Sequence, residues 1–116
     1  MADIYTQVGE EFTVDQLDAF GNYYVAWGTG AGTAAKGDTT LSTEASEARV
    51  ITTDSQPAAD QMQWLGTITA DGGKTITNAG IFDAATVGNL IMHSDFTGIV
   101  LAASDKIEFT FQLTFS

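Results

Sequence analysis

The sequence lacks cysteine, and its 116 residues include only four basic residues, one histidine and one proline. Without cysteine the chain can form neither disulfides nor thiolate metal sites, so its stability must come from packing or from oligomerisation. The basic residues are scattered singly, at Lys36, Arg49, Lys74 and Lys106. Nucleic acid and anionic membranes bind clustered positive charge, so the sequence predicts neither as a partner.

Long apolar runs are also missing. No stretch approaches the ~18 apolar residues that cross a bilayer, and residues 1–5 lack the basic start and apolar core of a signal peptide. We therefore expect synthesis in the cytoplasm. Fifteen acidic residues give a net charge of −11, which favours solubility through self-repulsion and would also suit a basic partner. The length and a hydrophobic fraction of 44% indicate one folded domain with one core.

Apolar and polar residues alternate most clearly at the C-terminal end, with the period of a half-buried strand. One face of this segment carries five large side chains: Ile107, Phe109, Phe111, Leu113 and Phe115. Met62, Trp64 and Ile68 form a second face of the same kind. Because such faces must be covered, the pattern predicts an all-β fold, an antiparallel two-sheet β-sandwich. Jelly rolls use the same alternation, so we expect a jelly-roll-like sandwich without distinguishing it from other two-sheet folds.

Further strands are expected within a single β-sandwich domain of residues 23–116, at residues 23–27, 49–53, 75–83, 89–96 and 99–102. Asp71-Gly72-Gly73-Lys74 is typical of a tight turn, which predicts a hairpin between the strands on either side of it. Ala79-Gly80 interrupts one strand, and a glycine at such a place indicates a β-bulge.

The N-terminal residues 1–22 differ from the rest of the chain, because the first twelve contain few apolar side chains. Residues 1–12 have no evident place in a core and are predicted to form an extended arm. A short helix is expected at residues 13–20, with Thr13 as its N-cap and Gly21 as its stop.

No complete catalytic or cofactor motif is present. The glycine cluster at residues 28–32 follows a strand, but the dinucleotide-binding pattern needs a third glycine where Thr33 stands. A flexible connection between strands explains the cluster. His93 has Asp95 on its predicted face, but it lacks an activated nucleophile and is interpreted as a partly exposed strand residue. We expect no catalytic residues, no cofactor and no metal site.

Two groups of side chains leave alternatives open. An acidic group could gather a cation, although it lacks the 12-residue spacing of an EF-hand; its members are Glu10, Glu11, Asp15 and Asp18. An aromatic group could stack on sugars or line an interface; its members are Tyr23, Tyr24, Trp27 and Trp64. Core burial is the favoured interpretation for both tryptophans.

Several motifs of the chain occur in an order that is known from one family. They are YVAWGTG at residues 24–30, DTTL at residues 38–41, the segment 44–49, and ITNAGIFDA at residues 76–84. Together with a turn at Asp105 and the terminal alternating strand, they resemble small structural proteins of tailed bacteriophages over about residues 23–115. Such proteins are capsid decoration proteins or tail-appendage components. The resemblance implies no catalytic residues.

The resemblance implies a virion structural protein. The leading expectation is a capsid decoration, or cement, protein that binds the major capsid protein on the outer capsid surface and bridges capsomers. A homotrimer is expected, because local three-fold axes are common on icosahedral lattices. The partner contacts are expected within the arm, where a polar chain carries spaced apolar anchors. These anchors are Ile4, Tyr5, Val8, Phe12 and Val14.

Two other functions are considered. The first is a tail-fibre or baseplate component that recognises host-surface glycans, although a fibre usually needs a shaft or an attachment segment and none is evident here. The second is an enzyme, such as a cupin-like or glycan-cleaving β-sandwich. A cupin metal site needs a cluster of histidines, which a chain with one histidine cannot supply.

Overall fold

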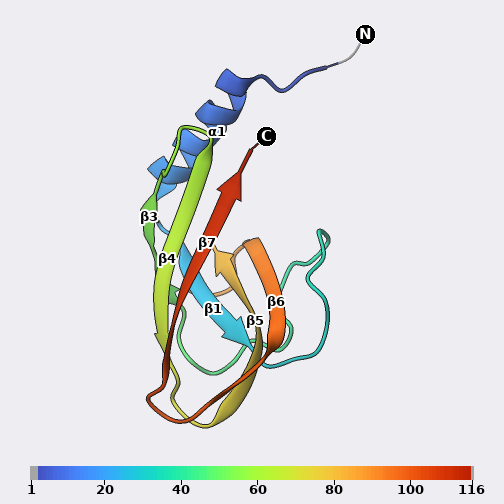
Figure 1. Cartoon of the computed structure of the whole chain (residues 1–116), viewed down its shortest axis with the longest axis vertical. Helices are drawn as coiled ribbons and strands as arrows, with labels where there is room; N and C mark the ends of the chain where they lie inside the picture. Colours follow the sequence, from blue (N-terminus) through green and yellow to red (C-terminus); the bar gives the residue numbers. More distant parts are fainter. Residues whose placement is uncertain (1–2, 116) are drawn as a thin grey trace.

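The computed structural model describes residues 3–115 and shows one helix followed by seven strands in two sheets (Figure 1). The helix is α1 (Gln7–Phe20), and the strands are β1 (Tyr24–Gly28), β2 (Val50–Ile51), β3 (Thr53–Ser55), β4 (Gln61–Thr69), β5 (Lys74–Phe82), β6 (Leu90–Leu101) and β7 (Lys106–Thr114). The larger sheet has the order β2-β1-β5-β6, and the smaller sheet has the order β3-β4-β7. All strand pairs are antiparallel, which confirms the predicted two-sheet β-sandwich.

The two sheets are joined along one side of the sandwich and open along the other. β2 and β3 are consecutive, and Thr52 between them donates its backbone N–H to the Tyr23 carbonyl oxygen at 2.9 Å. The chain therefore passes from the larger to the smaller sheet without a loop. On the opposite side, β6 and β7 are the last strands of their sheets. The rings of Phe96 and Phe109 lie 6.3 Å apart there, so two long edge strands border this side.

The core lies between the two sheets and uses the faces that the alternation predicted. β4 and β7 pair in a register that places Trp64 opposite Phe111, with both side chains on the core face. A large apolar side chain that leaves water in this way contributes about 1.5–3 kcal/mol to folding. The fully buried apolar residues from both sheets include Val25, Trp27, Met62, Trp64, Ile68, Ile76 and Ile81.

The hairpin predicted at Asp71-Gly72-Gly73-Lys74 is wrong. β4 pairs with β3 and β7, whereas β5 pairs with β1 and β6, so this turn carries the chain from one sheet to the other. The turn between β6 and β7 also crosses between the sheets, and Ala70 ties the two crossings together. Its N–H donates to the Asp105 carbonyl oxygen at 2.7 Å, and its carbonyl oxygen accepts from Ser104 N–H at 2.8 Å. Glycine-rich turn chemistry suits both kinds of connection, so it does not determine pairing.

α1 begins one and a half turns earlier than predicted. Thr6 is the N-cap, and its hydroxyl accepts the Gly9 N–H at 3.1 Å, while Gly21 ends the helix with a φ of 70° as expected. The extended arm is therefore wrong for residues 7–12, and residues 1–2 lie outside the described part of the chain. The C-terminal half of α1 lies beside β3 and β4, and the N-terminal half projects beyond the strands (Figure 1).

Gly80 does not form the bulge that was predicted for Ala79-Gly80. The register between β5 and β6 shifts on either side of it, between Ile76 and Asn78 and between Ile81 and Phe82. A Cβ atom at Gly80 would lie 2.7 Å from the Met92 carbonyl oxygen, so close approach of β6 requires glycine at this position.

Candidate interaction sites

Residues 29–49 form a long loop that covers the outer face of the larger sheet. Leu41, at the middle of the loop, is buried against Ala26 of β1 and Phe82 of β5. Thr29 and Gly30 donate their backbone N–H groups to the carbonyl oxygens of residues 43 and 42, both at 2.9 Å. The glycine cluster is therefore part of a pinned loop, and the flexible connection predicted for it is not what the structure shows.

Asn78 of β5 is the polar residue that anchors this loop. Its side chain is almost fully buried, and its amide pairs with the backbone of Ser42: Oδ1 accepts the Ser42 N–H at 3.1 Å, and Nδ2 donates to the Ser42 carbonyl oxygen at 3.1 Å. A buried amide with both ends satisfied stabilises one loop position over others. Asn78 was not predicted from the sequence. An amide side chain on the same strand face as Ile76 and Gly80 is a signal that could have identified it.

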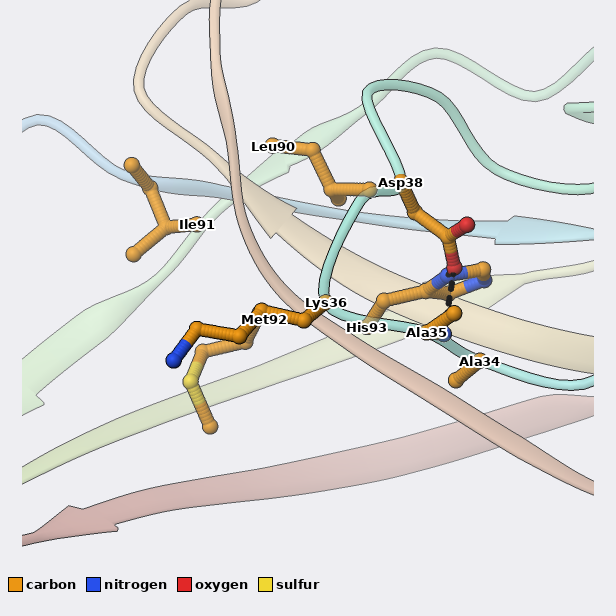
Figure 2. Close-up of a pocket in the computed structure, with 8 residues that line it drawn as sticks. All are labelled: Ala34, Ala35, Lys36, Asp38, Leu90, Ile91, Met92 and His93. Atoms are coloured by element: carbon orange, nitrogen blue, oxygen red, sulfur yellow. Dashed lines mark hydrogen bonds and ion pairs between the residues drawn. The ribbon is translucent and has the colours of Figure 1, made fainter.

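His93 adds a second connection between the sheet and the loop. Its Nδ1 lies 2.7 Å from Asp38 Oδ2 (Figure 2). Its Nε2 lies 3.1 Å from Asn78 Oδ1. The Ala35 N–H and the His93 ring lower the pKa of the Asp38 carboxyl. Asp95, which was expected to lie beside His93, accepts the Ala34 N–H instead. Both ring nitrogens of His93 are engaged, so its evident role is to hold the loop.

A hollow of about 380 Å³ lies between the loop and β6 (Figure 2). Residues 34–36 and Asp38 line it on the loop side, and residues 90–93 line it on the strand side. The His93 and Asp38 side chains at its wall already bind each other. Its other strand residues, Leu90, Ile91 and Met92, are apolar, and Lys36 adds a charged side chain on the loop side.

The aromatic group is mostly part of the core. Tyr23, Trp27 and Trp64 are at most 2% exposed, which confirms the burial predicted for both tryptophans, and only Tyr24 is half-buried. Burial, together with the charge of Asp54, raises the pKa of Tyr23. These rings therefore form no exposed stacking surface. The acidic residues of α1 are not gathered either: among residues 3–115, no three His, Asp or Glu side chains form a metal-binding group.

The N-terminal segment exposes large apolar side chains. Ile4, Tyr5, Val8 and Phe12 are 81%, 56%, 75% and 63% exposed, and we call these four residues the N-terminal apolar row. The fifth predicted contact, Val14, is fully buried in the core and is not available to a partner. The Tyr5 ring packs edge-on against Phe115 with centroids 6.2 Å apart, which fixes the row relative to the sandwich.

The charge around the row has one sign. α1 carries Glu10, Glu11, Asp15 and Asp18, and the chain has no basic residue before Lys36. In the part of the chain that the structure describes, the helix is also too short and too polar to cross a membrane. The row therefore begins just before an acidic helix and continues along the N-terminal half of that helix, which projects from the sandwich.

The motifs that carried the resemblance meet in the fold. Arg49 forms two hydrogen bonds with the Glu44 carboxylate, at 2.9 and 3.0 Å, and its guanidinium lies 3.6 Å over the Phe82 ring. It also donates to the carbonyl oxygens of Ala84 and Val87. Arg49 thus connects the 44–49 motif to the 76–84 motif and stabilises the loop.

The family model of Gp80, described as Podophage GP4 fiber I protein gp80, matches residues 12–114 of the chain. The match covers most of α1 and all seven strands, and it extends the resemblance seen in the sequence toward the N-terminus. Of the N-terminal apolar row, only Phe12 lies within it. No curated protein and no solved structure matches the chain. The resemblance to small structural proteins of tailed phages is confirmed.

Proposed function

The chain belongs to the family of the podophage GP4 fiber I protein gp80, and we propose that it is a tail-fibre component that works by binding other virion proteins. Membership in this family makes it a structural protein of the virion. The family description names a fibre, which favours the tail over the capsid decoration role expected from the sequence. The proposed partner is accordingly a neighbouring fibre or tail protein and not the major capsid protein.

The proposed attachment surface is the N-terminal apolar row. The row exposes four large apolar side chains to solvent within one short segment. Exposed apolar patches of this kind indicate protein interaction sites. Glu10 and Glu11 lie between Val8 and Phe12 in the sequence, so the surface that receives the row is expected to be an apolar groove with lysine or arginine at its rim. A second copy of the chain fits this description poorly, because its own helix is acidic.

A non-catalytic role is part of the proposal. It is supported by His93, whose two ring nitrogens are engaged by Asp38 and Asn78, since a general base needs a free nitrogen. Recognition of host glycans by aromatic stacking is not included, because Tyr23, Trp27 and Trp64 are buried.

The test uses a phage that encodes this chain and carries an amber mutation in its gene. Complementation supplies the wild-type chain, Val8→Asp, or the control Val87→Asp, whose position in the β5–β6 loop is 84% exposed. Aspartate suits the first turn of a helix, so Val8→Asp removes an apolar anchor without weakening α1. Immunoblots of purified virions measure incorporation, and immunoelectron microscopy locates the chain.

We expect label on the tail, full incorporation of Val87→Asp, and at least ~10-fold less incorporation of Val8→Asp, the loss typical of an interface anchor. Label on the capsid shell would overturn the fibre assignment. Equal incorporation of the two variants would overturn the attachment surface.

A further inference from the structure

The C-terminal half of β6 is an edge strand that carries a register shift but no charged residue and no proline. β6 pairs only with β5 among residues 3–115, so its other edge presents unpaired backbone N–H and C=O groups. Proteins normally cover such an edge or interrupt it with charged residues or proline, because it can pair with another chain. A register shift interrupts the β5–β6 pairing at residues 96–98, and we call the regularly paired residues 99–101 of β6 the open edge.

The loop covers the other half of β6 but not the open edge. Within the described residues, the hydrogen bonds between the loop and β6 are made by His93 and Asp95, at the N-terminal side of the open edge. Beyond them, Ile99 is 40% exposed and Val100 is 79% exposed. Beyond the register shift, Ile99, Val100 and Leu101 pair regularly with Ile76, Thr75 and Lys74 of β5.

The open edge differs in charge from the other edges of the sandwich. Residues 96–104 contain no charged residue and no proline, in a chain whose net charge is −11. The other edge strands are each charged or short. β3 contains Asp54, β7 contains Lys106 and Glu108, and β2 has only two residues. Next to the open edge, Phe96 and Phe109 are only partly buried, with their rings 6.3 Å apart. The neutral strand thus borders an incompletely covered part of the core.

From this we infer that the open edge is the surface through which copies of this chain associate with one another. At a rotation axis identical residues meet, so a charged residue there would face its own copy and repel it. An uncharged, β-branched segment has no such cost and can continue the sheet of a neighbouring copy. A basic partner would gain nothing from this neutral edge and would be attracted to the acidic helix instead.

The inference concerns a different surface from the attachment proposal and does not depend on it. An edge that pairs with its own copy makes a two-fold contact, so the inference gives pairs of chains and does not account for the homotrimer expected from the sequence. It also separates two kinds of binding on one small domain, with copies of the chain meeting at the open edge and the heterologous partner meeting the N-terminal apolar row.

The test measures the solution mass of the full chain by light scattering on a sizing column over a range of concentrations. The variants are Val100→Glu, Val100→Lys and the control Val87→Glu, which places the same charge at a similarly exposed valine beyond the opposite end of β6. Because the Val100 side chain is exposed, the fold of each variant is expected to persist, and far-UV circular dichroism checks this.

We expect the wild type and Val87→Glu to have a mass of at least twice the 12.2 kDa of one chain. Both Val100 variants should raise the dissociation constant at least ~100-fold, because like charges would meet at the axis. Val100→Lys is informative because added positive charge on an acidic protein should otherwise promote association. A monomeric wild type, an associated Val100→Lys, or dissociation of Val87→Glu would each overturn the inference.

Discussion

Replacing Glu47 by glutamine tests the ion-pair network that joins the loop to the 71–74 corner. The Glu47 side chain is 6% exposed and accepts hydrogen bonds from Trp27 Nε1 at 2.8 Å, from Asp71 N–H at 3.0 Å and from Lys74 Nζ. Burial raises the pKa of Glu47, but the hydrogen bonds from Lys74, Trp27 and Asp71 outweigh it and lower the pKa to about 2. The folded state therefore favours the carboxylate.

A lowered pKa in the folded state gives stability that is complete above the unfolded value and is lost as the pH falls through the folded value. For Glu47 these values are 4.5 and about 2, and the difference is worth about 3 kcal/mol at neutral pH. We expect Glu47→Gln to lower the free energy of unfolding by that amount at pH 7, because glutamine keeps an acceptor oxygen but has no charge for Lys74. At pH 3 the loss should be roughly half as large.

Urea unfolding, followed by tryptophan fluorescence at pH 7 and pH 3, measures both values. Glu108→Gln, on the exposed face of β7, is the control and should change the free energy of unfolding by no more than ~0.5 kcal/mol. The reasoning is refuted if Glu47→Gln costs less than about 1 kcal/mol at pH 7, within the range of ordinary surface changes. It is also refuted if the cost is the same at both pH values.

Two further predictions concern buried positions. Trp27→Phe should destabilise the fold by about 1.5–3 kcal/mol more than Trp64→Phe. The Trp27 indole N–H donates to the Glu47 carboxylate, whereas the Trp64 indole N–H has no partner among residues 3–115. Equal losses of unfolding free energy in urea would contradict this prediction. Gly80→Ala should cost about 1–3 kcal/mol through overpacking against β6. Gly72→Ala, where a Cβ meets nothing within 4 Å, should leave the thermal midpoint unchanged or raise it.

The alternating apolar faces were predictable because each one lies within a single segment and must be buried whatever strand it pairs with. Five large side chains on every second residue of the C-terminal segment must face a core, and the same holds for Met62, Trp64 and Ile68. Burial of both tryptophans follows from the same pattern. Strand pairing is not local. The turn at residues 71–74 permits either a hairpin or a crossing between sheets, and the packing of β4 against β7 decides between them.

The helix start was missed for a local reason. Gly9 lies inside the first turns and costs about 1 kcal/mol in a helix interior, and the apolar residues around it face solvent, so no core-facing period marks residues 7–12. The Thr6 cap and the contact of Tyr5 with Phe115, a residue 110 positions away in the chain, outweigh that cost. A sequence shows the first of these but not the second.

The loop anchor was beyond the sequence for a related reason. Asn78 binds Ser42 across 36 residues, and His93 binds Asp38 across 55 residues, so neither pair has a spacing that a motif could record. The glycine cluster looked flexible because glycine is permissive, yet Gly28 is required by close packing: a Cβ atom there would lie 2.5 Å from the Ser42 carbonyl oxygen. Composition cannot distinguish a glycine that gives freedom from one that permits contact.

The charge distribution suits both of the contacts that we propose for this small acidic domain. Copies that each carry a net charge of −11 repel one another over most of their surfaces, so association is favoured only where both sides are neutral, as at the open edge. The same acidity attracts α1 to a basic surface. The N-terminal apolar row would add buried apolar contacts, which supply binding free energy that charge alone does not supply. Raised salt should therefore strengthen the contact between copies, by screening their repulsion, and weaken the contact of α1 with its partner.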